Sequence, residues 1–101
     1  MTDVAELLDA IEERKDVLKT LGYKVRFDIV EGGSILVDAT GGGVAVSEGG
    51  GAADTVLKLK ADNLKKLIEG RLNPMIAFST GRLKVTGSQG VALKLAGLLE
   101  S

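Results

Sequence analysis

Apolar residues in the first part of the chain recur every three or four positions, as in an amphipathic helix. Asp3 precedes this pattern with Glu6 three residues later, which is the arrangement of an N-terminal capping box. Gly22 follows it and is a typical residue for a helix end. We therefore predict one helix over residues 4–21, with charged positions 12–15 on its solvent side. Its apolar positions are Val4, Leu7, Leu8, Ile11, Leu18 and Leu21.

The spacing changes to two at residue 23, where Tyr23, Val25, Phe27 and Ile29 alternate with polar residues. This pattern predicts a strand with one covered face. Three more apolar runs follow at residues 34–40, 44–47 and 55–61, separated by glycine-rich segments. Glycine supplies the positive φ that tight hairpins need, so we expect the four strands to form an antiparallel meander. The glycine segments are not phosphate-binding loops, because they precede strands and lack a Gly-Lys-Ser/Thr sequence.

The last part of the chain predicts two short helices, a fifth strand over residues 82–86 and a final helix. Residues that favour helix N-caps precede each helix, and proline occupies the first position of the second one. The resulting order predicts an α+β fold, in which a five-stranded, mostly antiparallel sheet has one face covered by about four helices. The predicted caps are Asp62, Asn73 and Ser88, and the closing glycines are Gly70 and Gly81.

The final helix is apolar almost all the way round. From Val91 to Leu99 the only charged residue is Lys94, and the only other non-aliphatic residue is Gly97. A helix of this kind has to be buried against protein, lipid or a ligand. Each apolar side chain near it is, taken singly, typical of plain core packing, but together they favour a gap that takes an apolar ligand. The residues expected to line this gap are Met75, Ile76, Phe78, Leu83, Val85, Val91, Leu95 and Leu98.

Composition argues against catalysis and metal binding. The 101 residues include no cysteine and no histidine, so the commonest nucleophile–base pairs and metal ligands are missing. Residues 86–90, Thr-Gly-Ser-Gln-Gly, only partly match a nucleophile elbow, and no histidine could serve the serine. We expect no enzymatic activity, no metal and no cofactor.

Charge and hydropathy indicate where the protein acts. The formal net charge is −1 at pH 7, which gives no basic footprint for nucleic acid. The N-terminal residues are acidic where a signal peptide would be basic, and no apolar run reaches the length of a membrane span. We therefore expect a soluble, cytoplasmic protein that makes at most transient contact with membranes.

Several segments resemble the sterol carrier protein type-two family: residues 53–59, 69–70, 72–75, 77–78, 81–87 and 90–95. The resemblance implies one domain over residues 1–101, with helices and a five-stranded sheet around a hydrophobic tunnel. It also implies binding or transfer of lipids, such as a fatty acid, a fatty acyl-CoA, a sterol or an isoprenoid chain. Leu72 joins the predicted ligand-binding residues through the matching Leu72-Asn-Pro-Met75 segment.

A different class of function stays open from the sequence. An exposed apolar helix could instead pair with a second copy or with a separate enzyme. In that interpretation the chain is an interaction module, a homodimer, or an accessory subunit in lipid or quinone metabolism.

Overall fold

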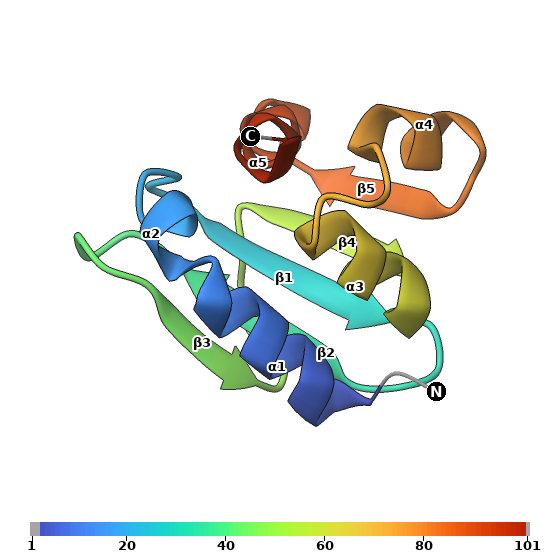
Figure 1. Cartoon of the computed structure of the whole chain (residues 1–101). Coiled ribbons are helices and arrows are strands. Elements are labelled where there is room, and N and C mark those ends of the chain that lie inside the picture. The colour runs from blue at the N-terminus through green and yellow to red at the C-terminus, as the bar shows by residue number, and fades with distance from the viewer. Residues whose placement is uncertain (1–2, 101) are drawn as a thin grey trace.

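The computed structural model describes residues 3–100, and it has the α+β architecture expected from the sequence (Figure 1). The order of elements is helix pair, four strands, two helices, strand, helix. Their bounds are α1 Val4–Glu13, α2 Lys15–Leu18, β1 Lys24–Ile29, β2 Ser34–Asp38, β3 Ala45–Glu48, β4 Thr55–Leu59, α3 Ala61–Ile68, α4 Pro74–Ser79, β5 Leu83–Gly87 and α5 Gln89–Glu100.

The five strands form one sheet in the order β3-β2-β1-β4-β5. All neighbouring pairs are antiparallel except β1 and β4, which run parallel with Phe27 opposite Leu57. A mostly antiparallel sheet is therefore confirmed, but the predicted four-strand meander is wrong. Only β1, β2 and β3 form a meander, after which the chain returns past β1 to start β4.

The segment between β3 and β4 makes this return across the open face of the sheet. The Gly51 carbonyl accepts a hydrogen bond of 2.9 Å from Arg26 Nη1, and Arg26 lies on that face. A Cβ atom at Gly51 would lie 3.3 Å from the Leu36 side chain, which also lies there. The glycine-rich segment therefore acts as a close-packed crossover rather than as a hairpin turn.

The opposite face of the sheet carries the hydrophobic core. Buried and half-buried residues alternate along β1 and β2, as the period of two predicted. Figure 1 shows α1, α2 and α3 lying over this face and α4 and α5 over its β5 end. The largest fully buried apolar side chains come from both layers: Leu7, Ile11, Leu21, Val25, Ile35, Val37, Leu59, Leu64, Leu67, Ile68 and Leu95.

Most of the predicted helix caps are confirmed. Asp3 Oδ1 accepts from the Glu6 N–H at 2.9 Å, Asn73 Oδ1 accepts from Met75 at 2.8 Å, and Ser88 Oγ accepts from Val91 at 3.2 Å. Asp62 is the exception, because α3 begins at Ala61 and Lys60 occupies the cap position without a side-chain bond. The Ala61 N–H instead donates to Glu31 Oε1 at 3.0 Å.

The predicted single helix over residues 4–21 is broken at Arg14, between α1 and α2. Arg14 was expected on the solvent side, but it is half-buried and its Nη2 donates to the Leu99 carbonyl at 3.1 Å. This bond connects the break to the last turn of α5. A cation is favourable there because the C-terminal end of a helix carries partial negative charge.

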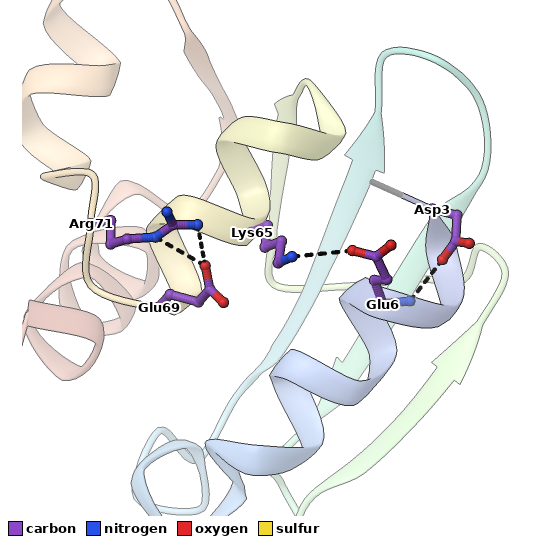
Figure 2. A network of polar contacts seen from close by, with 5 residues as sticks. All are labelled: Asp3, Glu6, Lys65, Glu69 and Arg71. Atoms are coloured by element: carbon purple, nitrogen blue, oxygen red, sulfur yellow. Dashed lines mark hydrogen bonds and ion pairs between the residues drawn. The ribbon is translucent and has the colours of Figure 1, made fainter. Parts of the chain in front are cut away.

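Polar contacts join α1 to α3 above the core (Figure 2). Lys65 Nζ lies 3.1 Å from Glu6 Oε2, the same Glu6 whose backbone N–H is capped by Asp3. Beyond α3, Arg71 is paired with Glu69 through two nitrogens of its guanidinium. These groups are solvent-exposed, so each pair stabilises the fold by only about 0–1 kcal/mol.

A close backbone contact fixes the junction between β5 and α5. Gly87 has φ +90°, and a Cβ atom there would lie 2.8 Å from the Asp54 carbonyl oxygen. The same carbonyl accepts a hydrogen bond of 2.9 Å from the Ser88 N–H. Glycine is therefore needed at position 87 to hold the start of α5 against the start of β4.

Candidate functional site

The candidate site is a partly open apolar cavity of about 250 Å³ between α3, α4, α5, β4 and β5. These elements meet there because α4 and α5 both pack against β5, on the covered face of the sheet (Figure 1). The lining residues are Leu57, Leu67, Pro74, Met75, Phe78, Leu83, Val85, Gln89, Ala92, Leu93, Leu95, Ala96 and Leu99.

Strand register and helix spacing explain why these side chains converge. Leu57 of β4 lies opposite Val85 of β5, so the two side chains share the covered face of the sheet. On α5, Ala92, Ala96 and Leu99 lie three or four residues apart and therefore on one side of the helix. The two alanines are too small to reach across to the sheet. Their small size is one physical reason that the space is left open.

The cavity is open to solvent on the side where its lining side chains are only partly buried. Met75 is 49% exposed, Phe78 48% and Leu93 57%, although all three line the cavity. Ile76, 57% exposed, adds a further apolar side chain on α4. We call these four residues the apolar rim. Single exposed apolar residues are ordinary, but a group of them beside a cavity is typical of a binding site.

The chemistry of the lining is almost wholly apolar. Gln89 supplies its one polar side chain, and no lining residue is titratable. Such a surface can hold hydrocarbon by burial of apolar area, while one amide offers a hydrogen bond to a neutral polar group. Within residues 3–100 no group of three acidic, histidine or cysteine side chains is arranged to hold a metal ion.

The structure brings five of the nine predicted ligand residues to the cavity: Met75, Phe78, Leu83, Val85 and Leu95. It places the other four elsewhere. Val91 is buried in the core, Leu72 and Leu98 are half-buried and pack against the core, and Ile76 is exposed on α4.

Sequence reasoning missed a further set of lining residues. Ala92 and Leu99 lie three and four residues from Leu95, so their helical spacing was a usable signal within α5. No local pattern indicated Leu57 or Leu67, because their approach depends on strand pairing and on the position of α3. The full set that was missed is Leu57, Leu67, Pro74, Gln89, Ala92, Leu93, Ala96 and Leu99.

The protein itself covers only part of the apolar surface of α5. Val91, Leu95 and Leu99 are buried, whereas Leu93 and Lys94 are exposed. The Lys94 ammonium lies 5.3 Å from the centre of the Tyr23 ring, which places a cation over an aromatic face at the edge of the helix. One side of α5 therefore closes the cavity and core, Leu93 lies at the open part of the cavity, and Lys94 faces solvent.

A second hollow of about 510 Å³ lies at the far end of α4, where β4 ends and β5 begins. Its lining includes four exposed cations and no carboxylate, so its character is opposite to that of the apolar cavity. Thr80 and Gly81, at the end of α4, contribute to it. The four cations are Lys58, Lys60, Arg82 and Lys84.

In the part of the chain that the structure describes, no helix is both long enough and apolar enough to cross a bilayer.

Comparison with known proteins identifies the family to which this chain is similar. The profile of the SCP-2 sterol transfer family matches residues 4–100. Hydroxysteroid dehydrogenase-like protein 2 of Homo sapiens is 35% identical over 88 residues, which are 83% of this chain and 21% of that protein. Sterol carrier protein 2 of Oryctolagus cuniculus is 31% identical over 93 residues, which are 86% of this chain and 17% of that protein.

Solved structures show the same fold. The sterol carrier protein domain 2 of Helicoverpa armigera matches with a TM-score of 0.72 and 28% identity, over 92% of this chain and 79% of that one. The curated relatives are much longer proteins, since this chain spans 21% of the length of the hydroxysteroid dehydrogenase-like proteins of Bos taurus and Homo sapiens.

Proposed function

This chain belongs to the SCP-2 sterol transfer family, and from that membership we propose that it binds the apolar part of a lipid in the cavity between α4, α5 and the sheet. In this proposal it carries or presents the lipid and does not transform it. A fatty acid, a fatty acyl-CoA, a sterol or an isoprenoid chain each supplies the required hydrocarbon. The observation that carries the proposal is the apolar, partly open cavity with a single neutral polar side chain.

Burial of hydrocarbon supplies the affinity. Each CH₂ group removed from water contributes about 0.8 kcal/mol, so a chain of several carbons offsets much of the cost of association. No charged residue lines the cavity to select a particular headgroup. We therefore expect modest affinity and selectivity by chain length and shape rather than by headgroup.

Cavity size limits how much of a ligand is enclosed. Pockets for small molecules commonly measure roughly 300–1,000 Å³, and this cavity measures about 250 Å³. A long chain therefore extends past the mouth, unless α4 or α5 moves outward to admit it. Met75, Phe78 and Leu93 would cover the emerging part, because they line the mouth and are half exposed.

A non-catalytic role is supported by the same lining. Catalysis of acyl or phosphoryl chemistry needs a nucleophile, a general acid or base, or a stabilising charge at the reacting atoms. The lining of the cavity offers Gln89 and otherwise only apolar side chains, of which Met75 carries an unreactive thioether. Binding without transformation is the role that these side chains support.

Displacement of a fluorescent fatty acid tests the proposal, with Met75→Glu as the perturbation and Val30→Glu as its matched control. Both residues are about half exposed, and only Met75 lines the cavity. We expect Met75→Glu to weaken binding about tenfold or more, because a carboxylate at the mouth has to be desolvated when hydrocarbon enters. Equal binding by both variants, or no saturable binding by the folded parent protein, would contradict the proposal.

A second candidate function is an accessory role beside an enzyme. The relatives matched over 21% of their length are named hydroxysteroid dehydrogenase-like proteins, so comparable domains occur within longer chains that carry an enzyme's name. In this alternative the domain holds an apolar substrate for a catalytic unit, and the apolar rim contacts that unit or a second copy. Analytical ultracentrifugation of lipid-free protein discriminates the dimer, since a tight dimer without lipid favours an interaction module.

A further inference from the structure

Two short segments of the same sequence pattern lie next to each other in the sheet. Residues 58–60, Lys-Leu-Lys, are at the end of β4, and residues 82–84, Arg-Leu-Lys, are at the start of β5. Lys58 lies directly opposite Lys84 in the antiparallel register, and the two leucines lie opposite each other. The remaining two cations follow one residue beyond the leucines. The fold therefore sets two pairs of cations side by side.

The alternation of side chains along a strand separates these leucines from the cations. Leu59 and Leu83 are buried on the covered face, so Lys58 and Lys84 project from the open face of the sheet. All four cations are exposed, and all four line the hollow of about 510 Å³. No residue lines both this hollow and the apolar cavity. The hollow is therefore a separate surface, which we call the cationic hollow.

The charge of the cationic hollow is not neutralised by the protein. Among residues 3–100 its four cations form no ion pair, whereas five other cations each have one. Asp28 lies opposite Lys58 on β1, but its carboxylate already accepts hydrogen bonds from Arg26 and Ser34. Glu31 accepts from the first backbone N–H of α3 and does not line the hollow. Like charges directly opposite each other destabilise a sheet, so this arrangement lowers the stability of the fold on its own.

Backbone hydrogen bonds hold the cations together despite their repulsion. Two of them are fixed by the pairing of β4 with β5. The Arg82 N–H donates to the Ala77 carbonyl of α4 at 2.9 Å, and the Lys60 carbonyl accepts from the Leu64 N–H of α3 at 3.0 Å. Only the ends of the side chains are free to move apart. An anion bound between them would replace repulsion with attraction, and the backbone would need no rearrangement.

From this paired arrangement we infer that the cationic hollow binds a small molecule that carries two or more phosphate groups. The Cβ atoms of directly opposite residues lie about 5 Å apart, so Lys58 and Lys84 can both reach one phosphate. Lys60 and Arg82 can reach a second one, and a guanidinium can donate two parallel hydrogen bonds to it. Each phosphate group carries a charge of roughly −1.5 to −2 at pH 7, so two of them nearly balance four cations. This site is additional to the proposed lipid cavity.

The size of the hollow favours a small ligand over an acidic peptide. Its volume of about 510 Å³ falls in the range of roughly 300–1,000 Å³ that small-molecule pockets occupy. Val30, Asn63 and Thr80 also line it, and they offer apolar contact and neutral hydrogen bonds to the organic part of such a molecule. Carboxylates on one face of an extended peptide are about 7 Å apart, as are the two cations of each segment. A peptide would therefore bring only about two negative charges to the four cations.

Calorimetric titration with inorganic diphosphate tests the inference. The titration is made at about 0.15 M salt, where attraction to scattered surface charges is largely screened. We expect saturable binding at one site per chain. Orthophosphate at the same ionic strength should bind at least tenfold more weakly, because it engages only one pair of cations. Equal binding of the two anions, or no saturable binding of diphosphate, overturns the inference.

Paired substitutions locate the site. Each hydrogen bond to a charged group contributes about tenfold, so Lys58→Gln with Lys84→Gln should weaken diphosphate binding about 100-fold. The matched control is Lys66→Gln with Lys94→Gln, which removes two exposed cations that line neither the hollow nor the cavity. Lys84→Arg keeps the charge and should retain the affinity within a few-fold. If both double variants lose affinity equally, the charge effect is general and the inference is wrong.

Stability supplies a readout that does not depend on calorimetry. Diphosphate should raise the urea midpoint of the parent protein, because it binds the folded state. It should not raise the midpoint of the Lys58 and Lys84 double variant. Without ligand, that variant should unfold at the same or a higher urea concentration than the parent, because the repulsion between the two lysines is removed. A lower midpoint without ligand would show that the two lysines stabilise the fold, which overturns the inference.

Other occupants of the hollow are distinguished by further measurements. Amide chemical shifts on addition of diphosphate should change at Asn63, Gly81 and Lys84, which line the hollow, and not at Met75 or Leu93, which line the cavity. Shifts spread evenly over both groups overturn the inference. Tighter binding of an oligo-aspartate peptide than of diphosphate assigns the hollow to an acidic protein segment instead. Binding to phosphatidylglycerol vesicles without binding of free diphosphate likewise overturns it, because the phosphate would then be recognised only in a lipid surface.

Discussion

Replacement of Ala96 by leucine tests whether the cavity is empty, apolar space that a ligand can use. Ala96 lies on α5, lines the cavity and is half-buried. Leucine at this position extends hydrocarbon into the open volume and keeps the helix propensity high. The account predicts opposite effects on two properties, since the protein should become more stable and bind lipid more weakly.

The size of both effects follows from the volume and the added carbons. An unfilled apolar cavity costs on the order of 24 cal/mol per Å³, so about 250 Å³ sets an upper limit of ~6 kcal/mol. The three added carbons recover about 2 kcal/mol of stability if they are buried. They also exclude a similar length of ligand, which makes the ligand's binding free energy less favourable by about 2 kcal/mol and weakens its affinity roughly 30- to 50-fold.

Urea unfolding and displacement of a fluorescent fatty acid measure the two effects on the same preparations. Ala5→Leu is the matched control, because Ala5 is exposed on α1 and no residue of α1 lines the cavity. The control should change neither quantity appreciably. If Ala96→Leu instead lowers the free energy of unfolding by about 1–3 kcal/mol, the site was already filled and the added carbons overpack it. Unchanged lipid binding would equally refute the reasoning.

Two other predictions concern the framework of the site. Gly87→Ala should lower the free energy of unfolding by about 2 kcal/mol or more, because alanine is strained at φ +90° and its Cβ would meet the Asp54 carbonyl at 2.8 Å. Gly97→Ala, in open space on α5, should instead raise the free energy of unfolding by about 0.5–1 kcal/mol. Urea titration of both variants checks this prediction, and equal losses of stability would contradict it. The hydrogen bond from Arg26 lowers the pKa of Asp28, so the stability that Asp28 contributes is present above its unfolded pKa and is lost as pH falls through the acid range below about 4. Asp28→Asn should therefore cost about 1 kcal/mol at neutral pH and reduce the loss of stability on acidification, and an unchanged pH profile in denaturant titrations would argue against this role.

Local patterns predicted much of the fold because local chemistry determines it. Asn73 accepts from the backbone of α4 wherever that helix packs, and the period of two in β1 faces Val25 and Phe27 to the core in any pairing. The pairing of the strands could not be predicted from local patterns. The parallel pairing of β1 with β4 depends on the path of residues 49–54 over the open face, which no local pattern encodes.

The break at Arg14 illustrates the same limit within a helix. The apolar spacing from Val4 to Leu21 continues on both sides of the break, so the sequence suggested one element. The half-buried guanidinium bonds to the Leu99 carbonyl, 85 residues away in the chain. Tertiary contacts of this kind override a local preference.

The sequence predicted that an apolar cavity exists, but it identified only some of the residues that line it. Met75, Phe78 and Leu95 were found because α4 and α5 have few polar positions. Leu57 was missed because a buried strand residue looks the same whether it faces packed core or open space. The emptiness depends on small side chains such as Ala92 lying opposite the sheet, and that depends on how α5 docks. A sequence pattern identifies apolar surface, whereas the volume left between two surfaces is a property of the assembled fold.

The most direct test of the central claim is a nuclear Overhauser measurement on the protein mixed with a carbon-13-labelled fatty acid. If the cavity holds the lipid chain, its methylene protons should give cross-peaks to the methyl groups of Leu57, Leu67 and Leu95, and none to Leu36 on the open face of the sheet. A bound fatty acid whose cross-peaks reach Leu36, or none of the three cavity leucines, would contradict the account.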